Sequence, residues 1–106
     1  MSHGLRILPA ADADVDAAAF FIAQDSVDAA LRFFDAVAAT YHKIREHPRA
    51  DARLMFDHPR LQDVRKCSVQ GFSSHLVFYR IDADMVEIIR VLHAARDLPA
   101  VLLEEN

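Results

Sequence analysis

The stretch that decides the fold is His75-Leu-Val-Phe-Tyr-Arg-Ile-Asp-Ala-Asp-Met-Val-Glu-Ile-Ile-Arg-Val-Leu-His93. It contains two apolar runs, rich in β-branched and aromatic residues, on either side of the acidic segment Asp82–Asp84. Two such runs joined by a short polar turn are typical of a β-hairpin. We therefore expect this hairpin to form the centre of a sheet, with the upstream part of the chain folded over one of its faces.

Two helices are expected upstream of the hairpin. The first begins at Pro9, because a proline suits the first turn of a helix, and it runs to about Gln24. Ser26 is a natural N-cap for the second helix, whose apolar residues recur at steps of three and four as far as Ile44. Pro48 then ends this helix. The short connection predicts that the two helices form an antiparallel helical hairpin.

Further strands are expected on both sides of the helices. The alternating segment Leu5–Leu8 predicts an edge strand, and alternation over Gln62–Val69 predicts a strand that turns at Gly71 into the hairpin. The expected fold is α+β in the order β-α-α-β-β-β, with the helical hairpin on one face of an antiparallel sheet and the other face open. The tail Arg96–Asn106 is expected to be extended or a short helix, and it either closes the core or presents a docking surface.

Length and composition limit the class of protein. The 106 residues predict a single domain over residues 1–106. A net charge of −4 argues against sequence-specific nucleic-acid binding. One cysteine, no signal segment and no apolar run that spans a bilayer favour a cytoplasmic location without a membrane partner. Since the histidines are scattered and only Gly4 and Gly71 are glycines, we expect no metal and no cofactor.

Several motifs of the hairpin and its flanks occur together in a known family. They are Gly71-Phe72, Phe78-Tyr79-Arg80 at a strand end, and Arg90-Val-Leu-His93 followed by Ala94-Ala-Arg96-Asp97. With these motifs the chain, from Leu5 to Leu98, resembles the ParE branch of the RelE/ParE toxin superfamily. The resemblance implies a type II toxin that inhibits DNA gyrase by binding and serves plasmid or chromosome stabilisation. It also implies a hetero-oligomer with a cognate antitoxin, a small DNA-binding protein whose segment folds on the toxin as a helix or added strand.

RelE-like relatives instead cut mRNA on the ribosome, and this enzymatic activity is the alternative. Cleavage requires a base, an acid and cations that hold the phosphate. The candidates for these roles are His93, Arg65, Lys66, Arg80 and Arg90. Ala94 stands where some nuclease members carry tyrosine, and the chain has only two lysines, so binding is favoured over catalysis. A toxin fold that has lost its toxicity is a further alternative.

Candidate binding residues form two groups. For the target we expect the open face of the sheet and the tail, with candidates Arg80, Arg90, His93, Arg96 and Leu98. For the antitoxin we expect an apolar groove between the helical hairpin and the sheet edge, with candidates Phe34, Tyr41, Leu54, Phe56 and Leu102.

The two hairpin arginines also have a structural interpretation. Parity within each strand places Arg80 and Arg90 on the same face as Phe78 and Ile88. An arginine on an apolar strand face usually pairs with a carboxylate, such as that of Glu87 or Asp97. His93 likewise suits a hydrogen-bonded structural role at the strand end.

Overall fold

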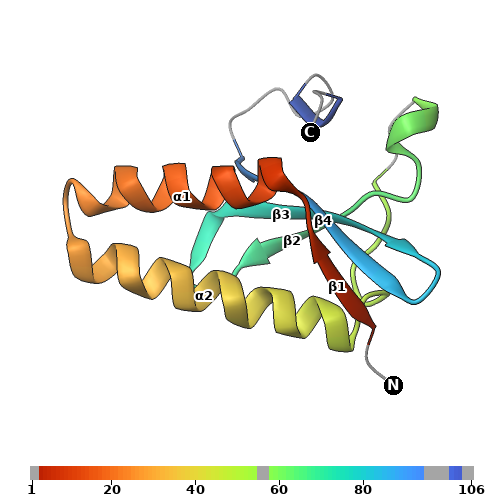
Figure 1. The fold of residues 1–106 in the computed structure, drawn as a ribbon, viewed down its shortest axis with the longest axis horizontal. Helices are drawn as coiled ribbons and strands as arrows, with labels where there is room; N and C mark the ends of the chain where they lie inside the picture. Colours follow the sequence, from red (N-terminus) through yellow and green to blue (C-terminus); the bar gives the residue numbers. More distant parts are fainter. Residues whose placement is uncertain (1–2, 55–57, 95–100, 104–106) are drawn as a thin grey trace.

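The computed structural model describes residues 3–54, 58–94 and 101–103. Its elements are β1 (Gly4–Ile7), α1 (Pro9–Ala23), α2 (Val27–Glu46), η1 (Pro59–Leu61), β2 (Arg65–Val69), β3 (Phe72–Asp82) and β4 (Met85–His93). Figure 1 shows α1 and α2 side by side, packed against a sheet of strand order β1-β4-β3-β2. The α+β fold and the element order are confirmed. The β1–β4 pair is parallel, so the sheet is mixed and not wholly antiparallel.

The boundaries of both helices follow the local signals in the sequence. Pro9 occupies the start of α1, as expected. The Ser26 hydroxyl accepts a hydrogen bond from the Ala29 amide at 3.1 Å, which caps the start of α2. Strand β2 begins only at Arg65, later than predicted, because Asp63 has a φ of 65° and interrupts the extended backbone.

The central hairpin forms as predicted, but its register contains a bulge. Phe78 lies opposite Arg90, whereas Tyr79 lies opposite Ile88, so Ile89 is an extra residue on β4. A bulge reverses the parity of the residues that follow it. The prediction that the two arginines share a face with Ile88 is therefore wrong, because Ile88 packs under the helices with Tyr79.

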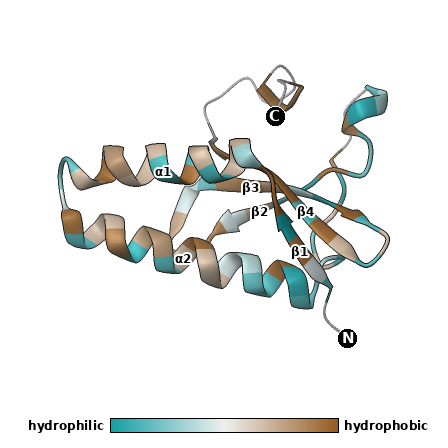
Figure 2. Ribbon diagram, viewed as in Figure 1, coloured by the Kyte–Doolittle hydropathy of each residue, from teal (hydrophilic) through white to brown (hydrophobic). Residues whose placement is uncertain are grey.

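Both faces of the sheet bury apolar side chains. The face toward the helices, here called the helix face, contributes Cys67, Val69, Val77, Tyr79, Val86, Ile88 and Val91. The opposite face, here called the far face, contributes Leu76, Phe78, Ile89 and Leu92 to a second cluster with Leu61, Val64, Val101 and Leu102. Figure 2 shows the hydrophobic character of the central strands. The prediction of an open face is therefore wrong, and the C-terminal segment closes the core.

No helix among the described residues is long and apolar enough to cross a membrane.

Two tight turns each contain a residue with a positive φ, a backbone conformation that glycine adopts more easily than other residues. Gly71 has a φ of +77° and Ala83 a φ of +56°, in the turns before and after β3. A Cβ on residue 71 would contact nothing within 4 Å, so only the backbone resists a side chain there. We expect Gly71→Ala to lower the free energy of unfolding by about 1 kcal/mol, and Ala83→Gly to raise it by about 0.5 kcal/mol. Urea unfolding of the two variants measures both effects, and a loss of stability in both would contradict this interpretation.

Candidate functional site

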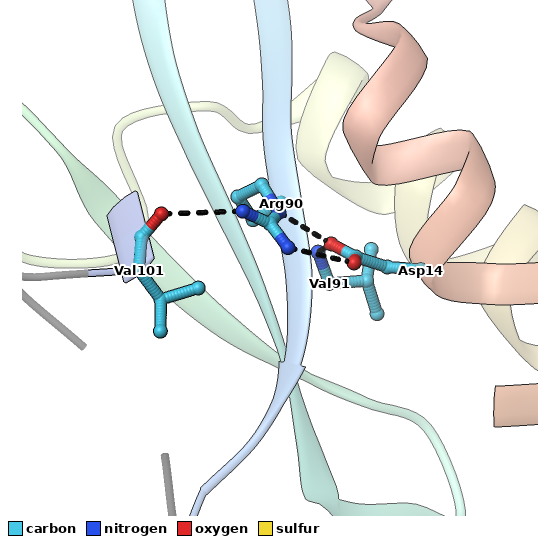
Figure 3. Close-up of polar contacts among 4 residues, drawn as sticks. All are labelled: Asp14, Arg90, Val91 and Val101. Atoms are coloured by element: carbon cyan, nitrogen blue, oxygen red, sulfur yellow. Dashed lines mark hydrogen bonds and ion pairs between the residues drawn. The ribbon is translucent and has the colours of Figure 1, made fainter. Parts of the chain in front are cut away.

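Arg90 is held in a buried ion pair that links three parts of the chain. Its Nε lies 2.7 Å from Asp14 Oδ2 and its Nη2 lies 2.9 Å from Asp14 Oδ1, while its Nη1 donates to the Val101 carbonyl at 3.2 Å (Figure 3). The two charged side chains are only 10% and 15% exposed. Asp14 Oδ2 also accepts from the Val91 amide at 3.0 Å. The Asp14–Arg90 pair therefore fastens α1, β4 and the C-terminal segment together.

Arg80 forms a separate ion-pair cluster on the far face. Its Nε donates to Glu87 Oε1 at 2.9 Å, and Arg6 Nη1 lies 2.6 Å from Glu87 Oε2. Mainly because of the hydrogen bond from Arg80, the pKa of the Glu87 carboxyl lies below its usual value. The pairing of Arg80 with Glu87 is as expected, and the Arg80 side chain is 38% exposed, so a partner can still reach it.

His93 lies on the other side of the sheet, beside a second histidine. It pairs with His75 across the hairpin, with ring centroids 5.5 Å apart, and His75 in turn contacts Phe33 of α2. Burial, and secondly the charge of His93, lower the pKa of His75. A pocket of 320 Å³ adjoins this pair and is lined by Asp14, Ala17, Ala18, Phe21, His75, Val91, Leu92 and His93.

The candidate nuclease residues do not converge on one site. Lys66 lies opposite Phe78 and so belongs to the far face with Arg80, while Arg65 lies opposite Tyr79 on the helix face. His93 is also on the helix side, and Arg90 is buried in its ion pair with Asp14. Among the described residues, the proposed base and the cations are therefore divided between two sides of the sheet.

The candidate antitoxin residues also lie in different environments. Tyr41 and Leu102 are buried in different cores, and Leu54 is half-buried against the second of these cores. Phe34 is 41% exposed. The fifth antitoxin candidate, Phe56, lies outside the described residues, as do the target candidates Arg96 and Leu98.

An exposed apolar groove on the outside of the helical hairpin was not predicted. It measures 320 Å³ and is lined by Asp16, Ala19, Phe20, Ala23, Val27, Ala30, Leu31 and Phe34, here called the hairpin groove. Phe20, Val27 and Leu31 are 72%, 63% and 58% exposed. The sheet covers only part of the apolar arc of α2, and the candidate antitoxin residue Phe34 lies in the uncovered part. The signal in the sequence for this groove was that the apolar residues of α2 cover a wider arc of the helix than one packing surface can bury.

A family model and solved structures match the chain. The family model for the ParE toxin of the type II toxin–antitoxin system parDE matches residues 5–98. No curated protein sequence matches the chain. A chain of the chromosomal ParDE system from P. aeruginosa superimposes with a TM-score of 0.69 at 16% identity, covering 87% of this chain and 96% of that one.

A second solved structure shares the fold. A chain of the toxin–antitoxin complex RelBE2 from Mycobacterium tuberculosis superimposes with a TM-score of 0.62 at 19% identity, covering 91% of this chain and 95% of that one. At such low identities both likenesses establish the fold alone.

The Asp14–Arg90 pair predicts a large loss of stability when one partner is removed. Asp14→Asn removes the Asp14 carboxylate from the buried Arg90 guanidinium, and we expect the free energy of unfolding to fall by about 3 kcal/mol. Asp12→Asn is the matched control, since Asp12 is an exposed carboxylate on the same helix, and its effect should be at most about 1 kcal/mol. Equal effects in urea unfolding would show that the pair contributes little.

Proposed function

The chain belongs to the ParE toxin family of type II toxin–antitoxin systems, and from this premise we propose that it inhibits DNA gyrase by binding. A cognate antitoxin would neutralise it in the cytoplasm. The observation that carries the proposal is the division of the candidate nuclease residues, of which Arg65 and Lys66 point to opposite faces of β2. Acid–base cleavage of RNA needs these groups around one phosphate. Inhibition by binding needs exposed surfaces instead, and the hairpin groove is one.

The hairpin groove is the surface that we assign to the antitoxin. Its floor is apolar, and its rim is acidic, because Asp16 lines it and Asp28 and Asp35 are exposed three residues before and four residues after Leu31. An amphipathic antitoxin helix with apolar residues on one side and lysine or arginine beside them matches both properties. A second copy of this chain would bring two acidic rims together, which charge repulsion disfavours.

The choice between a gyrase inhibitor and a ribosome-dependent nuclease needs two assays on the purified toxin after release from its antitoxin. We expect plasmid supercoiling by gyrase to be inhibited, with an increase in cleaved DNA complexes. We expect mRNA on translating ribosomes to stay intact. Cut mRNA together with normal supercoiling would refute the proposal and make His93 the first residue to substitute. No response in either assay would also refute it and favour a fold that has lost its toxicity.

Two neighbouring phenylalanines provide a matched test of the antitoxin surface. Phe20 and Phe21 are 72% and 73% exposed, but only Phe20 lines the hairpin groove. Phe20→Glu removes an apolar contact and adds repulsion within an acidic rim, so calorimetry should show antitoxin binding weakened about 100-fold. Phe21→Glu should change the affinity by less than about threefold. Similar affinities for the two variants would place the antitoxin elsewhere.

A further inference from the structure

Three arginines gather near the end of α2, away from the hairpin groove. Arg49, Arg53 and Arg65 line a pocket of 280 Å³ together with Asp63 and Ile81. The first two belong to the segment that follows α2, and Arg65 begins β2. In a chain of net charge −4, three arginines against one aspartate form a local excess of positive charge.

The backbone holds two of these arginines directly opposite each other. Arg53 and Arg65 form an antiparallel bridge, and the next residue, Leu54, donates its amide to the Val64 carbonyl at 2.7 Å. Like charges placed directly opposite in a ladder destabilise it. The fold therefore keeps together two positive charges that repel each other, and an anion between them would relieve that repulsion.

The existing contacts of the three arginines balance this charge only in part. Arg53 Nη1 lies 2.8 Å from Asp63 Oδ1, in a pair that is more than half exposed. Arg65 donates to the backbone carbonyl of Asp51, which is a neutral acceptor. Arg49 makes no hydrogen bond or ion pair within residues 3–54, 58–94 and 101–103. Within the pocket lining, one carboxylate, that of Asp63, thus stands against three guanidinium groups, while the nearby Asp51 carboxylate is engaged by the Tyr79 hydroxyl.

The segment that carries Arg49 and Arg53 is fixed to the sheet. The buried Tyr79 hydroxyl lies 2.9 Å from the Pro48 carbonyl and 3.0 Å from Asp51 Oδ2. Mainly because of burial, the pKa of Tyr79 is raised, so this hydroxyl stays protonated and can donate. Residues on both sides of Arg49 are therefore anchored, and the arginine pocket is positioned before any ligand binds.

We propose that this pocket binds a phosphate group. A phosphate presents enough acceptor oxygens for several guanidinium forks at once, whereas one carboxylate has two oxygens. The phosphate can come from a free nucleotide or from a nucleic-acid backbone, since both offer the same chemistry. The site lies on residues that the hairpin groove does not include, and the inference holds whether or not gyrase is the target.

The test is calorimetric titration of the full chain with inorganic phosphate, ATP and a short DNA duplex at constant ionic strength. We expect phosphate-bearing ligands to bind, and Arg49→Gln to weaken that binding about tenfold. Arg32→Gln is the control, because it removes the same charge from an exposed position on α2 outside the pocket. Equal effects of the two substitutions would overturn the proposal.

A second variant separates binding from folding, since it should improve affinity. Asp63→Asn frees Arg53 from its counter-charge and keeps a residue type that accepts the φ of 65°. Phosphate binding should become several-fold tighter, and unchanged or weaker binding would contradict the proposal.

The ligands distinguish the two sources of phosphate. Tight binding of ATP with weak binding of DNA would support the site as one for free nucleotides, and the reverse would support it as one for a nucleic-acid backbone. Tighter binding of a glutamate-rich peptide than of any phosphate ligand would overturn the proposal in favour of an acidic protein segment. None of these readouts depends on gyrase.

Discussion

The buried ion pair between Asp14 and Arg90 is the interaction on which the rest of the structure depends. One carboxylate accepts from the guanidinium and from the Val91 amide, and the same guanidinium reaches the Val101 carbonyl. It thereby joins the helical layer, the sheet and the C-terminal segment at one point. Because β1 pairs with β4 only as far as Ile88, Asp14 also satisfies a backbone donor on the part of β4 beyond β1. The far-face core is closed by the same segment that Arg90 binds.

A bulge at Ile89 lies next to this ion pair on β4. Without an extra residue on β4, the strand would keep one alternation of faces along its whole length. With it, Ile88 and Val91 both pack under the helices while Ile89 and Leu92 pack on the far face. Arg90 lies between these pairs, at the point where β4 meets α1. The bulge therefore decides which apolar residues of β4 flank Arg90 on each face.

Local signals in the sequence predicted where most of the helices and strands begin and end. Strand register and the partner of Arg90 depend on residues far apart in the sequence, so local signals did not predict them. Pro9, Ser26 and Gly71 mark boundaries through backbone chemistry that acts within a few residues, so they could be interpreted directly. Parity counting failed at Ile89 because nothing local marks a bulge between apolar residues. The partner of Arg90 lies 76 residues away, whereas carboxylates near it in sequence were the expected partners. The hairpin groove was missed because hydrophobicity predicts burial without saying against which surface.

The position of the surfaces bears on how neutralisation would work. The hairpin groove is built from residues 16–34, and the arginine pocket from residues 49–81, with no lining residue in common. A helix seated in the groove therefore leaves the pocket uncovered. Arg80 lies on the far face, which the sheet and the helical layer together separate from the groove. An antitoxin seated in the groove, as proposed, would then block target binding either by extending around the edge of the sheet or by its bulk. A segment that folds on binding can do the first, because an extended chain spans more surface than a preformed domain of equal length.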